Sequence, residues 1–423
     1  MKISILGLGY VGFPLACAAV KKTNHDILGF DIDSYKVDLI KERKSPVDDE
    51  QAEKDIKEIE LKATSNPSDM EGSDIYIVCV PTPVIDGYTP DLGPVKSAVI
   101  EVSNYLSKGQ IVVIESTINP GVCDEIVIPL IEDHTGLKAG EDFDVAHCPE
   151  RINPGDPVWN VYNIPRNVGA TSPAATKKIA DFYREIISGE VNEMPDIKST
   201  EATKIVENTF RDINIAFVNE LAKSFDVLGI NTDVVIKAAS NKPFAFMPHF
   251  PGCGVGGHCI PVDPYYLIER AKQSGFDHKF LKLARQINNS MPEYTIELLS
   301  DKLNTISKPV KGTKIAMLGL SYKANVGDLR ESPAIKLKSI LEDKGADLLI
   351  YDQYFPDFST HHNLESILKD SEALVIATNH RDISEIKLQS LIDNDIKVVI
   401  DGKNCLNDEI RYTDKLIYKG IGI

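Results

Sequence analysis

The sequence predicts an α/β protein in which two doubly wound domains, each built on a parallel sheet, are joined by a long central helix and a helical domain. Short β-branched runs alternate with helical stretches over residues 1–150 and again from Thr313, which is typical of βαβ units. Between these regions lie a long run of helical periodicity and a loop rich in proline and glycine. We therefore expect domains at residues 1–198, 199–308 and 309–423.

Short apolar runs predict the strands of the first domain, and all but the first run follow a polar or glycine-containing segment. The strands are expected at Lys2–Leu6, Asp26–Phe30, Asp74–Val80, Gln110–Glu115 and Phe143–Cys148. Several of these runs end in a polar residue. Because ligands of open α/β sheets bind at the carboxyl ends of the strands, those polar residues are candidate functional groups.

The first strand leads directly into a glycine fingerprint, G-x-G-x-x-G, that opens an apolar helix. Its residues are Gly7, Leu8, Gly9, Tyr10, Val11 and Gly12. Such glycines permit a tight turn, the approach of a pyrophosphate to the backbone and close packing of helix on strand. Asp31 follows Gly12 by 19 residues, which suits a carboxylate that binds ribose hydroxyls. The pattern predicts a Rossmann-like domain that binds NAD in preference to NADP, with Lys36 either on the adenosine side or on a solvated helix face.

A long helix is predicted from about Ser199 to Leu228, because apolar residues recur there at helical spacing without glycine or proline. Lys204 and Asn208 lie four residues apart, so both side chains project from one face of this helix. A solvated helix face is the alternative for such a pair. A second helical stretch is expected at about Phe280–Ile306.

The loop Pro243–Pro264 carries the candidate nucleophile. Four glycines between Gly252 and Gly257 allow the backbone to approach a ligand closely. Cys259 follows them, and Asp263 lies four residues further on, which brings a thiol and a carboxylate within reach of one site. We expect the other six cysteines to be inert core residues.

The third domain repeats the opening pattern of the first. Strands are expected at Lys314–Leu318, Asp347–Tyr351, Ala373–Ala377 and Lys397–Ile400. The segment Lys314–Tyr322 matches Lys2–Tyr10, and Asp352 corresponds to Asp31. Ser321 stands where the first domain has Gly9. We therefore infer a second Rossmann-like domain in which the glycine set is incomplete.

Composition excludes several classes of protein. The 423 residues carry 63 acidic and 46 basic side chains, a formal charge of −17 that disfavours nucleic acid or an anionic membrane as the main partner. The seven cysteines lack the spacing of a zinc site or a disulfide framework, so we expect reduced thiols in a cytoplasmic protein. His258 and the pair His147-Cys148 lack a second ligand pair, and no metal is predicted. No apolar stretch approaches about 18 residues, so neither a signal peptide nor a membrane span is expected.

Seven motifs in one order resemble the UDP-glucose/GDP-mannose dehydrogenases, which are nucleotide-sugar 6-dehydrogenases. The resemblance extends from Gly7 to about Lys403. Its motifs are the glycine fingerprint with Asp31, Val80-Pro81-Thr82-Pro83, Glu115-Ser116-Thr117, Pro149-Glu150-Arg151, Lys204 with Asn208, Gly256–Asp263 and Gly319–Lys323. The resemblance implies that two NAD oxidise the C6 alcohol of a sugar to a carboxylate, an activity of polysaccharide biosynthesis.

The resemblance also implies catalytic roles. Asp263 with an ordered water would take the alcohol proton, supported by Lys204 and Thr117. Cys259 would attack the resulting aldehyde as a thiolate, and the thiohemiacetal would be oxidised to a thioester. Lys204 and Asn208 would stabilise the developing oxygen charge. Water activated by Glu150, with Asp263 nearby, would then hydrolyse the thioester.

Binding roles follow from the same resemblance. Val80, Pro81 and Thr82 would line the nicotinamide side of NAD, with Ser116 and Thr117 beside them. Arg330 resembles a family arginine that reaches the cofactor. The residues expected to bind the UDP-sugar are Glu150, Arg151, Lys204, Asn208, Arg211, Gly256, Gly257, Tyr322, Lys323 and Lys403, of which Lys323 would supply a cation for the diphosphate.

The segment around Arg151 points to an N-acetylated sugar. Arg151 and Pro154 stand where the UDP-glucose and GDP-mannose enzymes carry Phe and a second Glu. The form Glu-Arg-x-x-Pro-Gly resembles the branch that acts on UDP-N-acetylhexosamines, and we favour UDP-N-acetylglucosamine over UDP-N-acetylmannosamine, with the galactosamine epimer behind. Arg151 and Arg211 are candidate substrate contacts, with plain salt bridges as the alternative.

Other functions stay open at this point. UDP-glucose is an alternative substrate, and a two-electron β-hydroxyacid-type dehydrogenase would share the fingerprint and the helical Lys–Asn pair without needing a thiol. A non-catalytic dinucleotide sensor is a third possibility. Apolar residues on more than one face of the long helix (Val206, Ile215 and Val218) predict a homodimer built on the central helices.

Overall fold

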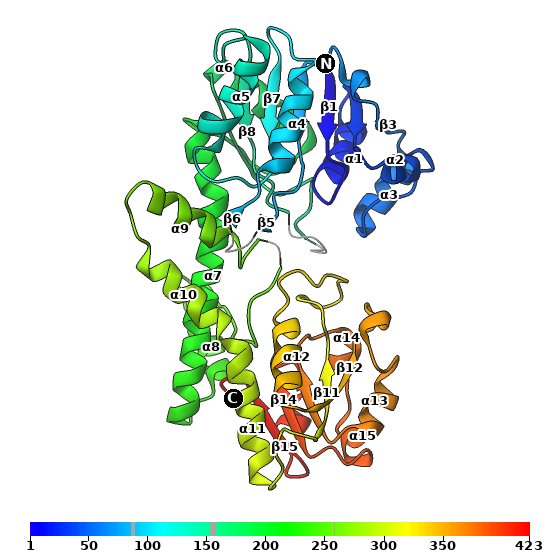
Figure 1. Cartoon of the computed structure of the whole chain (residues 1–423), viewed down its shortest axis with the longest axis vertical. Helices are drawn as coiled ribbons and strands as arrows, with labels where there is room; N and C mark the ends of the chain where they lie inside the picture. The colour runs from blue at the N-terminus through cyan, green and yellow to red at the C-terminus, as the bar shows by residue number, and fades with distance from the viewer. Residues whose placement is uncertain (86–88, 153–157, 258) are drawn as a thin grey trace. The chain divides into compact units, whose positions relative to one another are not determined.

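A computed structural model describes residues 1–85, 89–152, 158–257 and 259–423 (Figure 1). The chain divides into two compact units. The first comprises Met1–Glu207 and Tyr265–Gly275, and the second comprises Asn208–Pro264 and Phe276–Ile423. Helix α7 (Ile197–Leu228) begins in the first unit and ends in the second.

The first unit contains a sheet that has eight strands within the described residues, in the order β10-β9-β8-β7-β4-β1-β2-β3. Its strands are β1 (Lys2–Leu6), β2 (Asp26–Phe30), β3 (Lys62–Thr64), β4 (Ile75–Val78), β7 (Ile111–Ile114), β8 (Asp144–His147), β9 (Arg166–Ala170) and β10 (Val191–Glu193). From β3 to β8 this is the strand order of dinucleotide-binding sheets, and the order reverses between β1 and β4. The sequence predicted a parallel sheet. The structure differs at one pair, because β9 runs antiparallel to β8.

Two hydrophobic cores cover the faces of this sheet because alternate strand residues point to opposite sides. Ile3 and Ile5 of β1 pack into one core with α1 and α6, whereas Leu6 packs into the other with α4 and α5. The helices and remaining short elements of this unit are α1 (Gly12–Lys22), α2 (Ser34–Lys41), α3 (Glu50–Glu58), η1 (Pro67–Met70), β5 (Val84–Ile85), β6 (Thr89–Pro90), α4 (Gly93–Ser103), η3 (Cys123–Val127), α5 (Ile128–Thr135), α6 (Pro173–Ile186) and α9 (Asp263–Gln273).

The second unit contains a parallel sheet in the order β12-β11-β13-β14-β15. Its strands are β11 (Lys314–Leu318), β12 (Asp347–Tyr351), β13 (Ala373–Ile376), β14 (Val398–Asp401) and β15 (Ile417–Gly420). The order reverses between β11 and β13, which makes this the second doubly wound sheet. Its helices are α8 (Thr232–Ala239), α10 (Lys279–Asn289), α11 (Met291–Thr305), α12 (Pro333–Asp343), η4 (Pro356–Phe358), α13 (Leu364–Asp370), α14 (Arg381–Ser384), α15 (Leu388–Asp393) and α16 (Asp408–Arg411).

The predicted pair of Rossmann-like domains is confirmed, and four strands (β1, β2, β11 and β12) begin and end at the predicted residues. The helical stretch expected at Phe280–Ile306 is two helices, because α10 ends at Asn289 and Pro292 opens α11. The sequence analysis missed β3, β9, β10 and β15, which are three to five residues long. Such short strands carry too little period-2 pattern to identify.

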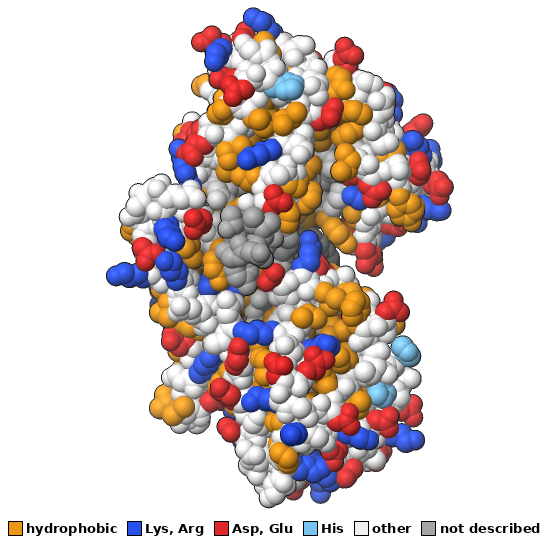
Figure 2. All heavy atoms as spheres, viewed as in Figure 1, with side chains coloured by type: hydrophobic (Ala, Val, Ile, Leu, Met, Phe, Trp, Pro, Cys, Tyr) orange, Lys and Arg blue, Asp and Glu red, His pale blue; other side chains and the backbone are white. Residues whose placement is uncertain are grey.

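Charged side chains of both signs are mixed over the face in view in Figure 2, so the net negative charge does not gather in one patch there. Within the described residues, we find no helix with the length and apolar character needed to cross a membrane.

Candidate active site

The glycine fingerprint forms a turn at the switch point between β1 and β4. Gly7 has φ of 91°, and a Cβ there would lie 2.8 Å from the carbonyl oxygen of Cys79. A Cβ on Gly12 would lie 2.1 Å from the Gly7 carbonyl oxygen, whereas a Cβ on Gly9 would meet no atom within 4 Å. Gly7 and Gly12 are therefore needed to build the turn, and Gly9 leaves an open approach to the backbone.

Asp31 holds this turn from the end of β2. It is buried, and its carboxylate accepts hydrogen bonds from the backbone amides of Leu8 (2.7 Å) and Asp33 (2.9 Å) and from Lys36 Nζ (3.2 Å). The structure thus brings Lys36 to Asp31, as an ion pair at the edge of the sheet.

The described residues at this edge fit a dinucleotide. No described side chain caps the first turn of α1, which Val11 precedes, and a Cβ on Gly9 beside this turn would meet open space. Amides at a helix N-terminus favour a pyrophosphate, and Asp31 is placed for ribose hydroxyls. Tyr10 is exposed at the same turn. NAD would be held by these residues.

The segments that follow β4 and β7 are joined at the predicted nicotinamide side. Ser116 Oγ donates to the carbonyl oxygen of Val80 at 2.7 Å. The carbonyl oxygen of Thr82 accepts from the hydroxyl of Tyr266 on α9 at 3.0 Å. Thr117 is half-buried beside Ser116, and Pro81 is exposed. The structure therefore brings Val80, Thr82 and Ser116 to one edge of the sheet.

Glu150 lies just beyond β8 and is buried, and its carboxylate accepts three hydrogen bonds. Oε1 accepts from the amides of Arg151 and Ile152, each at 2.5 Å, and Oε2 accepts from Arg166 Nη2 at 2.6 Å. The Arg151 guanidinium pairs with Glu207, at 2.7 Å between Nη2 and Oε1. The structure contains this salt bridge, and a contact of Arg151 with the substrate stays a prediction. Sequence reasoning missed Arg166, because the strand that carries it was not predicted.

Lys204 is half-buried on α7, and the residue one turn earlier anchors this helix. Glu201 is buried and accepts hydrogen bonds from the amides of Gly121 and Cys123, the latter at 2.9 Å. Burial raises the pKa of Glu201 to about 7, and the two amide hydrogen bonds oppose this rise. The segment that carries Thr117 is therefore tied to the helix that carries Lys204.

In the second unit, the predicted thiol, carboxylate and amide come together. The amide of Asp263 donates to the carbonyl oxygen of Cys259 at 2.8 Å, so the two residues share one turn. Asp263 is buried, and its Oδ2 accepts from Asn208 Nδ2 at 2.5 Å. Cys259 is half-buried, while Cys253 in the same loop is buried. His258 lies outside the described residues, as do Asn153–Pro157.

The glycines before Cys259 let this loop lie against the second sheet. The amide of Gly257 donates to the carbonyl oxygen of Arg330 at 3.0 Å. A Cβ on Gly256 or on Gly257 would approach Tyr322 to 2.7 and 2.8 Å. A Cβ on Gly252 would lie 3.9 Å from Lys403 Nζ. Of the predicted substrate residues, Tyr322 and Lys403 therefore contact the loop that carries Cys259.

Several charged groups surround Tyr322. Burial raises the pKa of Tyr322, and the neighbouring Asp328 adds to the rise, while Arg330 and Arg211 oppose it. The Arg330 guanidinium is ion-paired with Asp328, at 2.6 Å between Nη2 and Oδ2. Arg211 is exposed, and Lys323 next to Tyr322 is half-buried.

A buried polar chain anchors the start of the same loop to α7. Gly252 donates its amide to Asn219 Oδ1 at 3.0 Å, and Asn219 Nδ2 donates to Asn288 at 2.9 Å. Asn288 Nδ2 donates to Asp212 Oδ1 at 2.8 Å, and Arg285 pairs with the same oxygen at 2.5 Å. Sequence reasoning missed this chain. Its signal was the polar pair Asp212 and Asn219, seven residues apart on one helix face.

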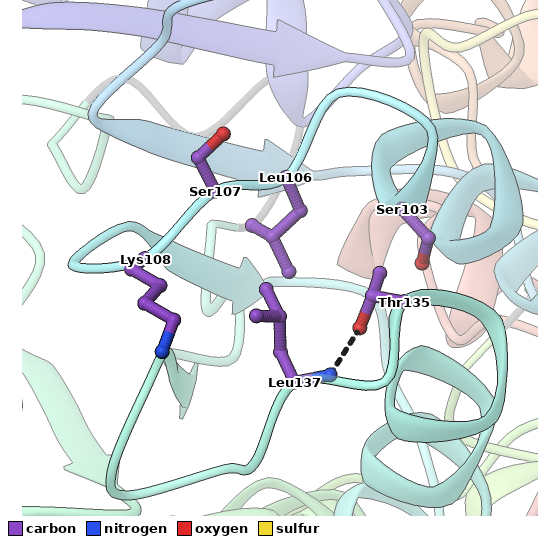
Figure 3. A pocket seen from close by; sticks show the side chains of 6 residues that line it. All are labelled: Ser103, Leu106, Ser107, Lys108, Thr135 and Leu137. Atoms are coloured by element: carbon purple, nitrogen blue, oxygen red, sulfur yellow. Dashed lines mark hydrogen bonds between the residues drawn. The ribbon is translucent and has the colours of Figure 1, made fainter.

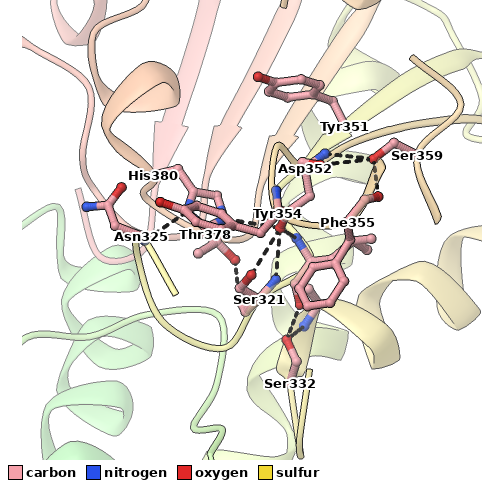
Figure 4. A network of polar contacts seen from close by, with 12 residues as sticks. Ser321, Asn325, Ser332, Tyr351, Asp352, Tyr354, Phe355, Ser359, Thr378 and His380 are labelled. Atoms are coloured by element: carbon pink, nitrogen blue, oxygen red, sulfur yellow. Dashed lines mark hydrogen bonds and ion pairs between the residues drawn. The ribbon is translucent and has the colours of Figure 1, made fainter. Parts of the chain in front are cut away.

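The second fingerprint is filled by its own side chains (Figure 4). Asp352 accepts from the amides of Leu320 and Ser321 at 2.6 and 3.1 Å and from His380 Nε2 at 3.0 Å. Burial raises the pKa of Asp352, but hydrogen bonds from His380 and from the Leu320 amide outweigh this effect and lower the pKa to about 2. Ser332 caps α12. The equivalent turn is thus closed where the first unit is open.

A separate pocket lies away from this chemistry (Figure 3). It is lined by Ser103, Leu106, Ser107, Lys108, Thr135 and Leu137. These residues flank the amino end of β7, whereas the fingerprint and Glu150 lie at the carboxyl ends of the strands. The pocket is therefore not part of the candidate active site.

Two glycine substitutions test separately whether a glycine is needed to fold the fingerprint turn and whether it is needed for NAD to bind there. Gly12→Ala should destabilise the protein by about 1–3 kcal/mol, because the new methyl group meets the Gly7 carbonyl. Gly9→Ala should leave the melting temperature unchanged and weaken NAD binding by about 10-fold or more, because its methyl group fills open space that a ligand needs. Thermal unfolding and calorimetric titration with NAD test both; unchanged NAD affinity in Gly9→Ala would contradict the assignment.

Comparisons with known proteins agree with this geometry. Residues 1–187 match the NAD binding domain, residues 198–290 the central domain and residues 316–408 the UDP binding domain of the UDP-glucose/GDP-mannose dehydrogenase family.

Individual relatives match over most or all of the chain. A UDP-N-acetyl-D-mannosamine dehydrogenase from Pyrococcus horikoshii is 35% identical over 100% of this chain and 99% of its own. A UDP-N-acetyl-D-glucosamine 6-dehydrogenase from Pseudomonas aeruginosa is 37% identical over 84% and 83% of the two chains. The solved structure of the UDP-D-ManNAc dehydrogenase from Pyrococcus horikoshii superimposes with a TM-score of 0.93, covering 100% and 99% of the two chains at 35% identity. The chain therefore belongs to the UDP-glucose/GDP-mannose dehydrogenase family and is an NAD-dependent UDP-sugar dehydrogenase.

Proposed function

We propose that the chain oxidises the C6 alcohol of a UDP-N-acetylhexosamine to the carboxylate through a thioester on Cys259. The observation that carries this proposal is the turn in which a half-buried thiol, Cys259, precedes a buried carboxylate, Asp263, that accepts an amide hydrogen bond from Asn208. A two-electron dehydrogenase needs no thiol at this position. NAD, when bound, accepts the hydrides that the two oxidation steps release.

The first step needs a base for the alcohol proton. Asp263 suits this role because it is a buried carboxylate that the Asn208 side-chain amide holds at 2.5 Å, in the turn that begins at Cys259. Lys204 and Thr117 are assigned to the substrate oxygen. The supporting observation is that Glu201 and Ser116 fix the segments that carry them.

The second step uses Cys259 as the nucleophile. Its thiolate forms a bond to the aldehyde carbon, and Lys204 and Asn208 stabilise the oxyanion that results. Loss of a second hydride converts the thiohemiacetal to a thioester. Water then attacks the acyl carbon, the carbon–sulfur bond breaks, sulfur leaves as the thiolate, and Glu150 accepts the proton from water.

The second unit is assigned to the UDP-sugar. Arg211, Lys323 and Lys403 supply positive charge for a diphosphate, and the closed turn at Asp352 is unsuited to a second dinucleotide. Arg330, although paired with Asp328, is assigned to the cofactor. We assign NAD binding to residues 1–198, the thiol loop to residues 199–308 and UDP-sugar binding to residues 309–423.

Two epimers compete as the substrate. The Glu-Arg-x-x-Pro-Gly segment favours an N-acetylated sugar, with UDP-N-acetylglucosamine as the first candidate. UDP-N-acetylmannosamine is the second candidate, because a relative of that name matches the whole chain.

A panel of UDP- and GDP-sugars monitored for NADH tests the reaction and the sugar together. We expect one UDP-N-acetylhexosamine to yield about two NADH per sugar, because both oxidation steps occur before product is released. UDP-glucose and GDP-mannose serve as controls. One NADH per sugar would contradict the four-electron reaction, and binding without NADH from any sugar would favour a sensor.

Replacement of the nucleophile provides a second test. Cys259→Ser should abolish uronate formation, because a serine hydroxyl does not form the thioester. Cys405→Ser is the matched control, since Cys405 is also only half-buried and burial raises the pKa of its thiol to about 12. Mass spectrometry of the products measures both variants. Unchanged uronate formation by Cys259→Ser would refute the mechanism.

We also propose a homodimer built on α7. Val206, Phe210 and Phe217 are about half exposed along one face of this helix, with exposed fractions of 56%, 48% and 52%. Light scattering should give twice the chain mass of 46.7 kDa. Phe210→Asp with Phe217→Asp should give a monomer, while Tyr412→Asp, a comparably exposed aromatic residue of the second unit, should not. A monomeric wild-type protein would refute this assembly.

A further inference from the structure

A fully buried arginine lies between two carboxylates in the first unit. Arg166 on β9 has no exposed surface, and its Nη2 donates to Glu150 Oε2 at 2.6 Å. Its Nη1 lies 3.8 Å from Oε1 of Glu115, which directly follows β7. Glu115 in turn accepts hydrogen bonds from the hydroxyl of Tyr183 on α6 and from Cys79 Sγ. Residues on or just beyond five elements of the unit (β4, β7, β8, β9 and α6) therefore converge on one buried ion network.

The network restricts what Glu150 can do. A carboxylate has about four acceptor positions, and the Glu150 carboxylate uses three of them, for Arg166 and for the amides of Arg151 and Ile152. One position is left for a single water molecule. The orientation of this carboxylate depends on Arg166, which supplies the charged donor among the three.

Arg166 itself is held mainly by charge and by an aromatic ring. Among the described residues, its Nε and Nη1 have no hydrogen-bond partner. Its guanidinium carbon lies 5.6 Å from the centroid of the Tyr183 ring, within the range of a cation–π interaction. A lysine ammonium is a point charge and does not reproduce a planar group that spans both carboxylates.

We propose that Arg166 is the positioning residue for Glu150 in thioester hydrolysis, with Glu115 and Tyr183 holding Arg166 in place. The proposal rests on the proposed function, in which Glu150 accepts the proton of the attacking water. Arg166 and Tyr183 do not touch the reacting atoms in this assignment. They act through the orientation and the charge of Glu150.

The network also predicts a pH dependence of hydrolysis. The groups that face Glu115 are Arg166, Glu150, Tyr183, Cys79 and Cys148, and burial raises the pKa of Glu115 to about 7 against the opposing charge of Arg166. Below that pH, Glu115 is neutral and Arg166 pairs with Glu150 alone, so Arg166 competes more strongly with water for the Glu150 carboxylate. Above it, Arg166 is shared between two carboxylates. Hydrolysis should therefore accelerate through about pH 7.

Rapid-quench kinetics of the full enzyme, with the UDP-sugar identified in the panel, test this proposal. Arg166→Lys should slow hydrolysis by about 10- to 100-fold, because Glu150 loses its orientation. A burst of NADH should precede the slow steady state, and mass spectrometry of the quenched protein should find the acyl group on Cys259. Equilibrium binding of the UDP-sugar should stay unchanged, whereas KM should fall with kcat because hydrolysis limits turnover. Glu115→Gln should abolish the acceleration through about pH 7.

A second pair of variants distinguishes the positioning role from a general effect on folding. Tyr183→Phe is the test and Tyr76→Phe is its control. Both tyrosines are fully buried in the first unit, and Tyr76 donates to the carbonyl oxygens of Met70 and Tyr105 at 3.3 and 3.2 Å, away from Glu150. Tyr183→Phe should accumulate the acyl-enzyme and Tyr76→Phe should not. If wild type produces two NADH but neither Arg166→Lys nor Tyr183→Phe accumulates acyl-enzyme, the positioning role of Arg166 is refuted and the proposed function stands. If wild type produces no NADH, the proposed function fails with it.

Discussion

The interaction on which both sheets depend is a buried carboxylate that binds the first amide of a glycine turn. Asp31 binds the Leu8 amide in the first unit, and Asp352 binds the Leu320 amide in the second, each at the end of the strand beside the turn. A charge-assisted hydrogen bond of this kind holds the turn at the switch point of a sheet. The same construction therefore occurs in both units, although the surroundings of the carboxylate differ.

In the first unit this carboxylate keeps room for a ligand, whereas in the second its own neighbours occupy it. Gly9 opens onto free space, but the equivalent Ser321 and the imidazole of His380 both bind Asp352. The second unit instead presents the backbone of the thiol loop, which reaches Tyr322 because Gly256 and Gly257 have no Cβ. The second unit thus combines a filled turn at Asp352 with a surface at Tyr322 on which the loop that carries Cys259 lies.

Motifs with local geometry were predictable from sequence. The fingerprint with Asp31 was recognisable because turn, strand and helix follow one another directly, and Cys259 with Asp263 because four residues close one turn. Short strands and buried polar partners were not. Arg166 pairs with residues 16 and 51 positions earlier in the sequence, Glu150 and Glu115, and its strand has five residues. No local pattern marks such a contact.

The sequence by itself determined the α/β class, the dinucleotide turn and the family. These features depend on residue type and spacing within one or two elements, which the chain order preserves. Only the tertiary structure decided that Arg151 pairs with Glu207, that Arg166 holds Glu150, and that the second turn is closed by His380. The physical reason is that a buried charged group needs a compensating partner. Which partner lies close enough depends on how strands that are distant in the sequence pack together.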